Sequence, residues 1–466
     1  MTSRPAIGPD PGPTGEAAFL RRLFGALRCA KVLHAAMRNY ESLPESAGSG
    51  DLDLIVPRAD GARARAAVLE AVEASGAVVV GSVAWGSFFR VAVLGPPQAA
   101  RGPWWGLQID LNCGVSFQGV PYVADDRLAD FITHRRGVPV LSPPLAAVLG
   151  FLKELLHNAV ASERYRPRAA QAAAGGWQEL AGVLQPLGES GLALLRRALL
   201  EELDAGAVRA VARGLRARLR SRALTRAPAR SLAASVDHVL SMARRVVSPP
   251  GVVIAVLGVD GTGKSTVLRA VEPALRAATH GAFHVRHLRP SLLPTLARLL
   301  KRDAGLDEGA ETVPHDGPPS GLLGSVARLG YYTADYIIGH WAVARPSIVR
   351  KPAIWVYDRY AYDMALDPLR FRIRAPHGLI RLFTWAAPKP ALIICLVADA
   401  STIARRKQEL PGAEIERQLE VLRRFAAAEP RAVLLSAEGT ELEVRDRFFV
   451  VLQDFLRRRQ VRGIAA

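Results

Sequence analysis

The sequence predicts an α/β protein in three parts: an N-terminal α+β domain, a helical middle region, and a C-terminal three-layer domain built on a parallel sheet. Three observations support this prediction. The chain has 466 residues, roughly three times the usual length of one domain. Short apolar runs separated by turn residues fill the N-terminal part, and strand-like runs alternate with helical patterns after residue 251. Between these parts, residues 145–247 show helical periodicity alone.

The N-terminal part begins with a leader and continues as a mixed domain. Residues 1–15 are rich in Pro and Gly without periodicity, so we expect them to be disordered. The domain at residues 16–144 opens with apolar residues at helical spacing, which predicts an amphipathic helix over residues 16–33. A second helix is expected near residues 61–75. The expected strands are residues 51–57, 77–84, 89–94 and 107–112.

Three aspartates in these strands form a candidate metal site. Asp51 and Asp53 stand two positions apart on one strand and therefore share a face, and Asp110 lies on a later strand that could run beside them. Converging carboxylates repel one another unless cations neutralise them, so the cluster predicts divalent metal, and two Mg²⁺ ions would suit nucleotidyl transfer. The alternative is that Asp51 and Asp53 are merely exposed residues of a half-buried strand.

The three aspartates and the surrounding strand pattern resemble the nucleotidyltransferase fold, in which a DxD strand and a third acidic strand hold the metal ions. The resemblance implies a nucleotidyltransferase-like domain at residues 16–144 with Asp51, Asp53 and Asp110 as metal ligands. The family's Gly-Ser pair, which binds the triphosphate ahead of the DxD pattern, is absent from the corresponding stretch. Arg38 stands there instead, so triphosphate binding does not follow from the resemblance.

The chain is strongly basic. It carries 61 Lys and Arg against 43 Asp and Glu, a formal net charge of +18. Such a charge favours anionic partners such as nucleotides, nucleic acid or anionic lipid, although an Arg-rich composition also follows from genomic base bias. The basic helical region at residues 145–247 contains closely spaced arginines, namely Arg213, Arg216, Arg218, Arg220, Arg222 and Arg226. On a helix these would surround most of the circumference, which favours a solvated surface over a contact for an acidic partner.

The C-terminal part, residues 251–466, follows a Ser-Pro-Pro-Gly stretch that reads as a linker. Its apolar runs are separated by helical patterns, which predicts a parallel sheet with right-handed crossovers and helices on both faces. Residues 303–320 are polar and rich in Gly and Pro, and we expect a mobile insertion there. The expected strands are residues 252–257, 283–287, 353–357, 391–397 and 432–436.

The strongest motif is GVDGTGKST at residues 258–266, which matches GxxxxGK[ST] between an expected strand and an expected helix. Glycines let the backbone curl so that successive N–H groups face a phosphate at the positive end of the helix. Lys264 would reach the β- and γ-phosphates of ATP, and the Ser265 hydroxyl would reach Mg²⁺. We expect the nucleotide contacts to come from Gly258, Gly261, Thr262, Gly263, Lys264, Ser265 and Thr266.

Asp358 and Arg359 follow the expected strand at residues 353–357. A P-loop enzyme places there the carboxylate that orients the magnesium shell, which makes Asp358 a candidate ligand. Arg359 would then lie at the carboxyl edge of the sheet, where ligands bind in open α/β folds, and is a candidate phosphate clamp. The alternative for Asp358 is that it caps the next helix.

The sequences GVDGTGKST, Asp358-Arg359-Tyr360 and Ala404-Arg405-Arg406-Lys407 resemble the thymidylate kinase-like branch of nucleoside and nucleotide kinases. The resemblance covers about residues 250–460. It implies that Asp260 contacts the acceptor's sugar, that Asp358 and Arg359 serve magnesium and the acceptor phosphate, and that a lid brings Arg405 and Arg406 over the transferred phosphate. The alternative for Arg405 and Arg406 is an exposed basic helix surface.

One segment departs from this family and leaves the acceptor open. The family's Arg-Glu-Pro sequence after the second strand is replaced by His287-Leu288-Arg289-Pro290. Arg289 is a candidate for holding an acceptor phosphate, but the base pocket cannot be transferred from the resemblance.

Together these features predict an ATP- and Mg²⁺-dependent phosphotransferase acting on a small-molecule nucleotide, nucleoside or sugar-phosphate acceptor. A second, nucleotidyltransferase activity is implied by the N-terminal resemblance. Chains that join two such domains resemble proteins of bacterial surface-polysaccharide gene sets, which suggests polysaccharide or nucleotide-sugar metabolism. The alternative from another class is a nucleotide-sensing regulator in which ATP switches an interaction without phosphotransfer. A nucleic-acid-binding protein is the least favoured, because no aromatic-basic signature accompanies the charge.

Composition also bears on the compartment. Three cysteines, Cys29, Cys113 and Cys395, cannot form a disulfide framework, and no apolar run reaches the roughly 18–20 residues that span a bilayer. The N-terminus lacks an apolar signal core. We therefore expect a cytoplasmic protein without a membrane span, and leave a homodimer open.

Overall fold

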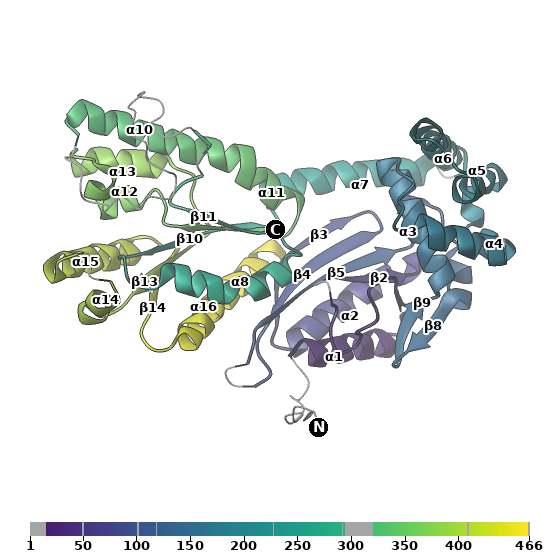
Figure 1. Cartoon of the computed structure of the whole chain (residues 1–466), viewed down its shortest axis with the longest axis horizontal. Coiled ribbons are helices and arrows are strands. Elements are labelled where there is room, and N and C mark those ends of the chain that lie inside the picture. Colours follow the sequence, from purple (N-terminus) through teal and green to yellow (C-terminus); the bar gives the residue numbers. More distant parts are fainter. Residues whose placement is uncertain are drawn as a thin grey trace, which may run out of the picture. The chain divides into compact units, whose positions relative to one another are not determined.

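The computed structural model describes residues 15–48, 51–99, 102–117, 119–226, 228–290, 292–293, 320–407 and 410–464. The chain divides into two compact units, Met1–Val247 and Ser248–Ala466 (Figure 1). Most of the expected leader and all but the last residue of the expected insertion at 303–320 lie outside the described residues. Gly15, assigned to the leader, already begins the first helix.

Unit 1 is built on a seven-stranded mixed sheet with the order β3-β4-β5-β2-β1-β9-β8. Its strands are β1 (Ala35–Ala36), β2 (Asp51–Val56), β3 (Val78–Trp85), β4 (Phe88–Gly95), β5 (Trp105–Cys113), β8 (Ile132–Arg135) and β9 (Val138–Leu141), and β6 (Ser116–Phe117) pairs with β7 (Val120–Pro121) in a separate hairpin. The expected strands correspond to β2, β3, β4 and β5. The other strands were not expected, because segments this short carry no readable alternation.

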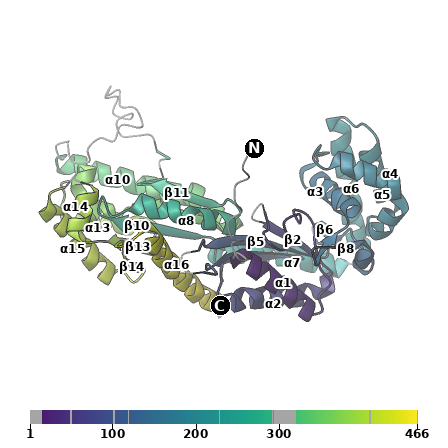
Figure 2. The same ribbon diagram turned by 60° about the horizontal axis from the view of Figure 1, so that its bottom comes forward.

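Helices cover both faces of this sheet. The helices are α1 (Gly15–Cys29), α2 (Gly61–Ala74), α3 (Pro143–Asn158), α4 (Arg166–Val183), α5 (Glu189–Leu200), α6 (Ala205–Arg226) and α7 (Pro228–Val247), with short 3-10 turns η1 (Arg58–Asp60), η2 (Asp125–Phe131) and η3 (Gln185–Leu187). Leu54 and Ile109 of the sheet share a core with Leu20 of α1 and Val68 of α2. In Figure 2, α1 and α2 lie below β2 and β5. Ile55, which points to the opposite face, belongs to a second core formed with α3 to α6.

The helical region at residues 145–247 is therefore not a separate body. Leu152 of α3 and Leu215 of α6 are fully buried in the same core as Ile55 of the sheet. A helix with one apolar stripe has to bury it, and the free face of the sheet supplies the partner. The basic side chains remain on the other side of α6, where Arg213, Arg218 and Arg220 are exposed.

Unit 2 has a five-stranded parallel sheet with the order β11-β12-β10-β13-β14. Its strands are β10 (Val252–Gly258), β11 (Phe283–His287), β12 (Ile354–Asp358), β13 (Leu392–Val397) and β14 (Ala432–Ser436). Each corresponds to an expected strand. All residues of β10 and β12 are buried, as a parallel sheet with two covered faces requires.

The helices of unit 2 form two layers around this sheet. They are α8 (Lys264–Ala278), α10 (Leu322–Gly339), the π-helical turn η4 (His340–Ala344), α11 (Arg345–Arg350), α12 (Asp363–Leu366), the 3-10 turn η5 (Pro368–Phe371), α13 (His377–Ala386), α14 (Ala400–Arg406), α15 (Gly412–Ala428) and α16 (Glu441–Ile464). Leu329 of α10 and Ile380 of α13 share a core with Ala255 of β10. In Figure 1, α10 and α13 lie on the opposite side of β10 from α8 and α16.

This topology places the candidate site residues of unit 2 at one edge of the sheet. The chain leaves β10 for β11, whose neighbour is β12, and later returns to β13 on the other side of β10. Ligands bind outside the carboxyl ends of parallel strands where the connections diverge in this way. Gly258, His287 and Asp358 end three of these strands.

A candidate phosphate-binding site in the C-terminal unit

The loop between β10 and α8 has the conformation that its glycines predict. Gly261 and Gly263 adopt positive φ angles of 87° and 91°. A Cβ atom on Gly261 would lie 3.1 Å from the Lys407 Cβ and 3.2 Å from the Ile403 backbone oxygen. Glycine is therefore required at this position for both its backbone angle and its space.

Lys264 is buried beneath this loop. Its Nζ donates hydrogen bonds to the backbone oxygens of Gly258 at 2.9 Å and Val259 at 3.1 Å, and it lies 3.7 Å from Asp260 Oδ1. Burial, together with the nearby Arg359 guanidinium, lowers the pKa of Lys264 to about 8. An anionic ligand at the loop would favour the charged form of this side chain.

Ser265 and Asp358 meet beside the loop. Ser265 Oγ donates to Asp358 Oδ2 at 3.1 Å, and His287 Nδ1 lies 3.3 Å from the same oxygen. Burial alone would raise the pKa of Asp358, but His287, Lys264 and Ser265 outweigh burial and lower it. The other oxygen, Asp358 Oδ1, is buried without a hydrogen-bond partner among the described residues. An ionised carboxylate with an unpaired oxygen next to a hydroxyl is a donor set that suits Mg²⁺.

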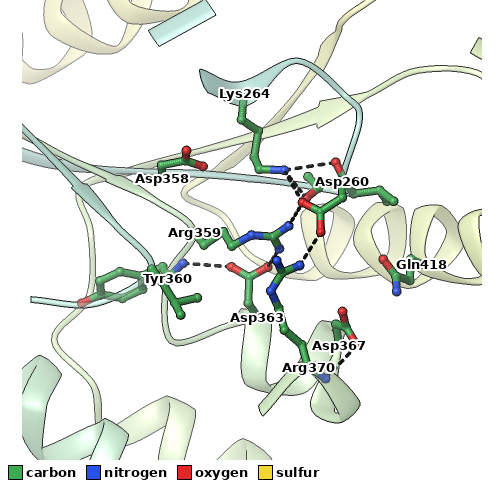
Figure 3. A network of polar contacts seen from close by, with 12 residues as sticks. Asp260, Lys264, Asp358, Arg359, Tyr360, Asp363, Asp367, Arg370 and Gln418 are labelled. Carbon is green, nitrogen blue, oxygen red and sulfur yellow. Dashed lines mark hydrogen bonds and ion pairs between the residues drawn. The ribbon is translucent and has the colours of Figure 1, made fainter. Parts of the chain in front are cut away.

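Asp260 is the centre of a second cluster (Figure 3). Its two carboxylate oxygens accept hydrogen bonds from two different guanidinium groups, those of Arg359 and Arg370. Arg359 also donates to Asp363 Oδ1 at 3.2 Å. Burial would raise the pKa of Asp260, but Arg359, Lys264 and Arg370 outweigh it and hold that pKa well below the usual range. Asp260 is therefore ionised throughout the physiological range of pH.

The backbone at Arg359 is held in a strained conformation. Its φ of 76° lies in the left-handed region that non-glycine residues rarely adopt. The surrounding contacts hold it there: the Arg359 N–H donates to the Val256 oxygen at 2.9 Å, and Asp363 Oδ2 accepts the Tyr360 N–H at 2.9 Å. Strain of this kind persists where the structure fixes a functional side chain.

A pocket of about 210 Å³ lies at the loop. Thr262, Gly263 and Thr266 line it, together with Arg406 of α14 and Gly439. Arg406 Nη1 donates to the Ala437 backbone oxygen at 3.2 Å, which fixes this guanidinium beside the loop. The P-loop residues thus have one pocket beside them and the Asp260 cluster near Lys264.

The structure separates some of the expected site residues. Both Arg405 and Arg406 of α14 are exposed, but only Arg406 lines the pocket, and Arg405 donates to Thr402 Oγ1 at 3.2 Å. Arg289 forms an ion pair at 3.3 Å with Asp335, a buried residue of α10. The roles expected for Arg405 and Arg289 remain predictions.

Sequence reasoning missed three residues of the site: Asp363, Arg370 and His287. Asp363 follows Arg359 at the i, i+4 spacing of a helix, which is a readable signal for an ion pair. Nothing in the sequence indicates that Arg370 reaches Asp260, because a contact over 110 positions depends on the fold. His287 ends the strand beside Asp358, and its position follows once these strands are known to be neighbours.

The three N-terminal aspartates of unit 1 come together as expected. Asp53 pairs with Asp110 in the register of β2 and β5, and Asp51 lies two positions along the same face. All three are buried, so the alternative of exposed residues on a half-buried strand is wrong. Burial, opposed by Arg38, raises the pKa of Asp53.

Arginines, however, already neutralise these carboxylates. Arg38 donates to Asp51 at 3.0 Å and also to Asp53, and Arg90 binds both oxygens of Asp110 at 2.8 and 2.6 Å. Within the described part of the chain, no group of three or more His, Cys, Asp or Glu side chains is arranged to hold a metal ion. As arranged, the three aspartates do not fit a divalent metal.

Comparisons with known proteins add little to this geometry. No protein family and no curated protein matches the chain. Among solved structures, the thymidylate kinase from Ehrlichia chaffeensis is similar with 18% identity and a TM-score of 0.30, covering 44% of this chain and 100% of that one. The thymidylate kinase from Candida albicans is similar with 16% identity and a TM-score of 0.32, covering 44% and 92%. Likenesses this low do not establish a fold or an activity. Among the described residues, no helix is both long and apolar enough to cross a membrane.

Proposed function

We propose that unit 2 is an ATP- and Mg²⁺-dependent phosphotransferase that moves the γ-phosphoryl group to a nucleotide, nucleoside or sugar-phosphate acceptor. The observation that carries the proposal is the buried Lys264 in a glycine loop at the start of α8, next to the Ser265–Asp358 pair. Backbone N–H groups at a helix start and one ammonium group make a site for polyphosphate.

The roles of the side chains follow from their positions. The loop and Lys264 bind the β- and γ-phosphates, and Thr262, Thr266 and Arg406 line the pocket that takes the rest of the donor. The acceptor approaches from the Asp260 cluster, where Arg359 can neutralise charge that develops on the transferred group. Phosphoryl transfer needs mainly such positioning and charge neutralisation, which these groups supply.

Magnesium would be held by Ser265 Oγ and the unpaired Asp358 Oδ1. The ion would supply positive charge that neutralises the phosphates of the donor. Asp358 fits this task because its carboxyl stays ionised, and its strand position fixes the direction of its oxygens.

Incubating the full chain with Mg²⁺, γ-labelled ATP and a panel of nucleotides, nucleosides, sugars and sugar phosphates tests the proposal. We expect a labelled product with at least one acceptor, and loss of ATP binding in Lys264→Ala by calorimetry. Arg381→Gln, an exposed change on α13, is the matched control and should behave as wild type. ATP binding without any labelled product would instead favour a nucleotide-sensing regulator.

For unit 1 we propose, as a second candidate, nucleotidyl transfer at the face that carries Asp51, Asp53 and Asp110, which would require metal ions to displace the arginines, Arg38 and Arg90, that now bind these carboxylates. Its support is the pairing of Asp53 with Asp110 and the burial of all three carboxylates. Transfer of a nucleotidyl group from a labelled triphosphate should vanish in Asp51→Asn and Asp53→Asn. Full activity in both variants would exclude the carboxylates from the reaction.

A further inference from the structure

One layer of helices in unit 2 carries large apolar side chains on its exposed surface. Ile338 of α10 is 44% exposed and Trp341 of η4 is 62% exposed, and on α13 Leu382 and Trp385 are 59% and 69% exposed. We call these four residues the α10–α13 face. Tryptophan is usually buried to a large extent, and exposed clusters of large apolar side chains mark surfaces that bind a partner.

The two helices that carry this face pack against each other. Thr333 Oγ1 of α10 donates to the Phe383 backbone oxygen of α13 at 3.4 Å, and Figure 1 shows both helices in the layer on one side of β10. The residues of the face lie within about two helical turns of this contact along their own helices. The face is therefore one surface region that two adjacent helices share.

Each exposed tryptophan has a cation over its ring. The Arg345 guanidinium carbon lies 5.7 Å from the centre of the Trp341 ring, and Lys389 Nζ lies 5.7 Å from the centre of the Trp385 ring. Cation–π attraction at such a distance holds each cation beside the apolar surface. The face thus combines exposed apolar groups with adjoining positive charge.

Acidic residues do not offset this charge. In the two segments that form the face, residues 322–345 and 372–389, Asp335 is the only Asp or Glu, and it is fully buried. An acidic group outside these segments that interacts with one of their cations, Glu429, is bound through both oxygens by Arg431 at 2.8 Å. The face therefore attracts an anionic partner.

The chemistry of the face favours a membrane surface as that partner. A second copy of the chain in a two-fold contact would bring Arg345 and Lys389 towards the same cations of the other copy. Nucleic acid and strongly acidic polypeptides would neutralise the cations but offer little apolar surface to Ile338 and Leu382. At an anionic membrane, aliphatic side chains enter the acyl boundary, tryptophan rings lie among the headgroups, and Lys and Arg reach the lipid phosphates.

From these observations we propose that the α10–α13 face binds peripherally to the surface of a membrane that contains anionic lipids. Trp341 and Trp385 enter the headgroup region, and Arg345 and Lys389 contact the lipid phosphates. The net charge of the chain supplies long-range attraction to such a surface, and the apolar side chains of the face determine which part of unit 2 meets it. The inference goes beyond phosphotransfer and does not depend on it.

Co-sedimentation of the full chain with lipid vesicles tests the proposal. Wild type should bind vesicles made of equal amounts of phosphatidylcholine and phosphatidylserine more tightly than vesicles of phosphatidylcholine alone. On the anionic vesicles, Trp385→Ala should lower the partition coefficient by about 5- to 10-fold and Trp341→Ala/Trp385→Ala by more than about 30-fold, because each ring buries apolar area in the membrane. Lys389→Gln should lower it by about fivefold, the usual effect of one cation at an anionic surface.

The positive charge of the whole chain calls for a charge-matched control. Arg457→Gln removes one exposed cation from α16, on the other side of the sheet, and should lower binding by less than about twofold. Because both tryptophans are exposed, their Ala variants should keep the wild-type melting temperature. Vesicles with brominated acyl chains should quench wild-type tryptophan fluorescence, and most of this quenching should disappear in Trp341→Ala/Trp385→Ala.

Several outcomes would overturn the proposal. One is a wild type that does not bind the anionic vesicles. Another is equal losses for Lys389→Gln and Arg457→Gln with no loss for the tryptophan variants, which would mean that net charge alone attracts the chain. Self-association in the ultracentrifuge that Trp341→Ala/Trp385→Ala abolishes, without vesicle binding, would make the face a contact between copies. Retention on polyglutamate or single-stranded DNA that the same variant loses, again without vesicle binding, would assign the face to that polymer.

Discussion

Ser265 Oγ and Asp358 Oδ2 lie 3.1 Å apart, although the residues are separated by 93 positions in the chain. Each lies at the carboxyl edge of the parallel sheet, Ser265 in the first turn of α8, after the loop that follows β10, and Asp358 at the end of β12. Because β10 and β12 are direct neighbours, their ends bring the loop hydroxyl and the carboxylate together. The hydrogen bond thus connects Ser265, which belongs to the glycine-loop motif, with Asp358, whose position beside that loop depends on the fold.

Removing either member of this pair should impair the use of magnesium. Asp358→Asn removes the charge and Ser265→Ala the hydroxyl, so more Mg²⁺ is needed to reach half-maximal transfer. We expect an increase of at least about tenfold for Asp358→Asn, which loses a charged ligand, and a smaller one for Ser265→Ala. A magnesium titration of the transfer rate measures both. Asp454→Asn, an exposed carboxylate on α16, should follow wild type; unchanged titrations for both site variants would exclude the pair from metal binding.

The pKa of Lys264 predicts how ATP binding depends on pH. Burial lowers this pKa to about 8, and only the protonated ammonium group attracts phosphate. Affinity should therefore stay level below pH 8 and fall by up to about tenfold per unit as pH rises above it, since binding takes up one proton. The terminal phosphate of ATP, with a pKa of about 6, is fully ionised over that range. Calorimetry between pH 7 and 9.5 measures the curve, and a flat profile for wild type would contradict it.

Whether the sequence predicts a residue of the candidate site depends on how far along the chain that residue lies from the residues it contacts. Gly261, Gly263, Lys264 and Ser265 were all identified, because a phosphate-binding loop is formed by consecutive residues whose backbone angles and chemistry are local. Arg370 could not be identified, because its contact with Asp260 requires η5 to fold back across the sheet edge. Local motifs therefore suffice to predict the loop residues of the proposed donor site, and Asp260 and Arg359 were also named from the sequence, whereas the contact of Arg370 with Asp260 depends on tertiary structure.

Unit 1 shows the same limit. The alternation along β2 predicted that Asp51 and Asp53 share a face, and the structure confirms it. The parallel pairing of β2 with β5, which sets Asp110 opposite Asp53, depends on strand order and was only a hypothesis. Arg90 lies in an expected strand, but its bidentate contact with Asp110 follows from the antiparallel register of β4 and β5.

Two adjacent arginines of α14 offer a matched comparison for the donor pocket. Arg406 lines the pocket together with Thr266, whereas Arg405 does not line it and donates instead to Thr402 Oγ1. Arg406→Ala should weaken ATP binding by roughly tenfold, as expected for one lost charge-assisted contact, and Arg405→Ala by less than about twofold. Titration calorimetry with ATP on both variants measures these two affinities. Equal losses would mean that α14 moves on binding and brings both arginines to the nucleotide.

Arg90 should stabilise unit 1 because it neutralises Asp110 inside the structure. The side chain of Asp110 is only 6% exposed, and Asp53 stands opposite it, so Arg90→Gln leaves a buried carboxylate without its counter-charge. Breaking a buried pair in this way costs about 3–5 kcal/mol, whereas Arg127→Gln, which breaks an exposed pair with Asp130, should cost less than about 1 kcal/mol. Calorimetric melting of the full chain measures both as shifts of the unit 1 transition.

Two further measurements test how the loss of the Arg90 charge can be compensated. The double variant Arg90→Gln/Asp110→Asn should recover most of the stability, because neither partner remains charged. Adding Mg²⁺ to Arg90→Gln distinguishes the two interpretations of the aspartates. If only an arginine can neutralise these carboxylates, Mg²⁺ leaves the melting temperature of Arg90→Gln unchanged. If it rises with Mg²⁺ and the rise disappears in Arg90→Gln/Asp53→Asn, the carboxylates can exchange an arginine for a metal ion, as nucleotidyl transfer in unit 1 would require.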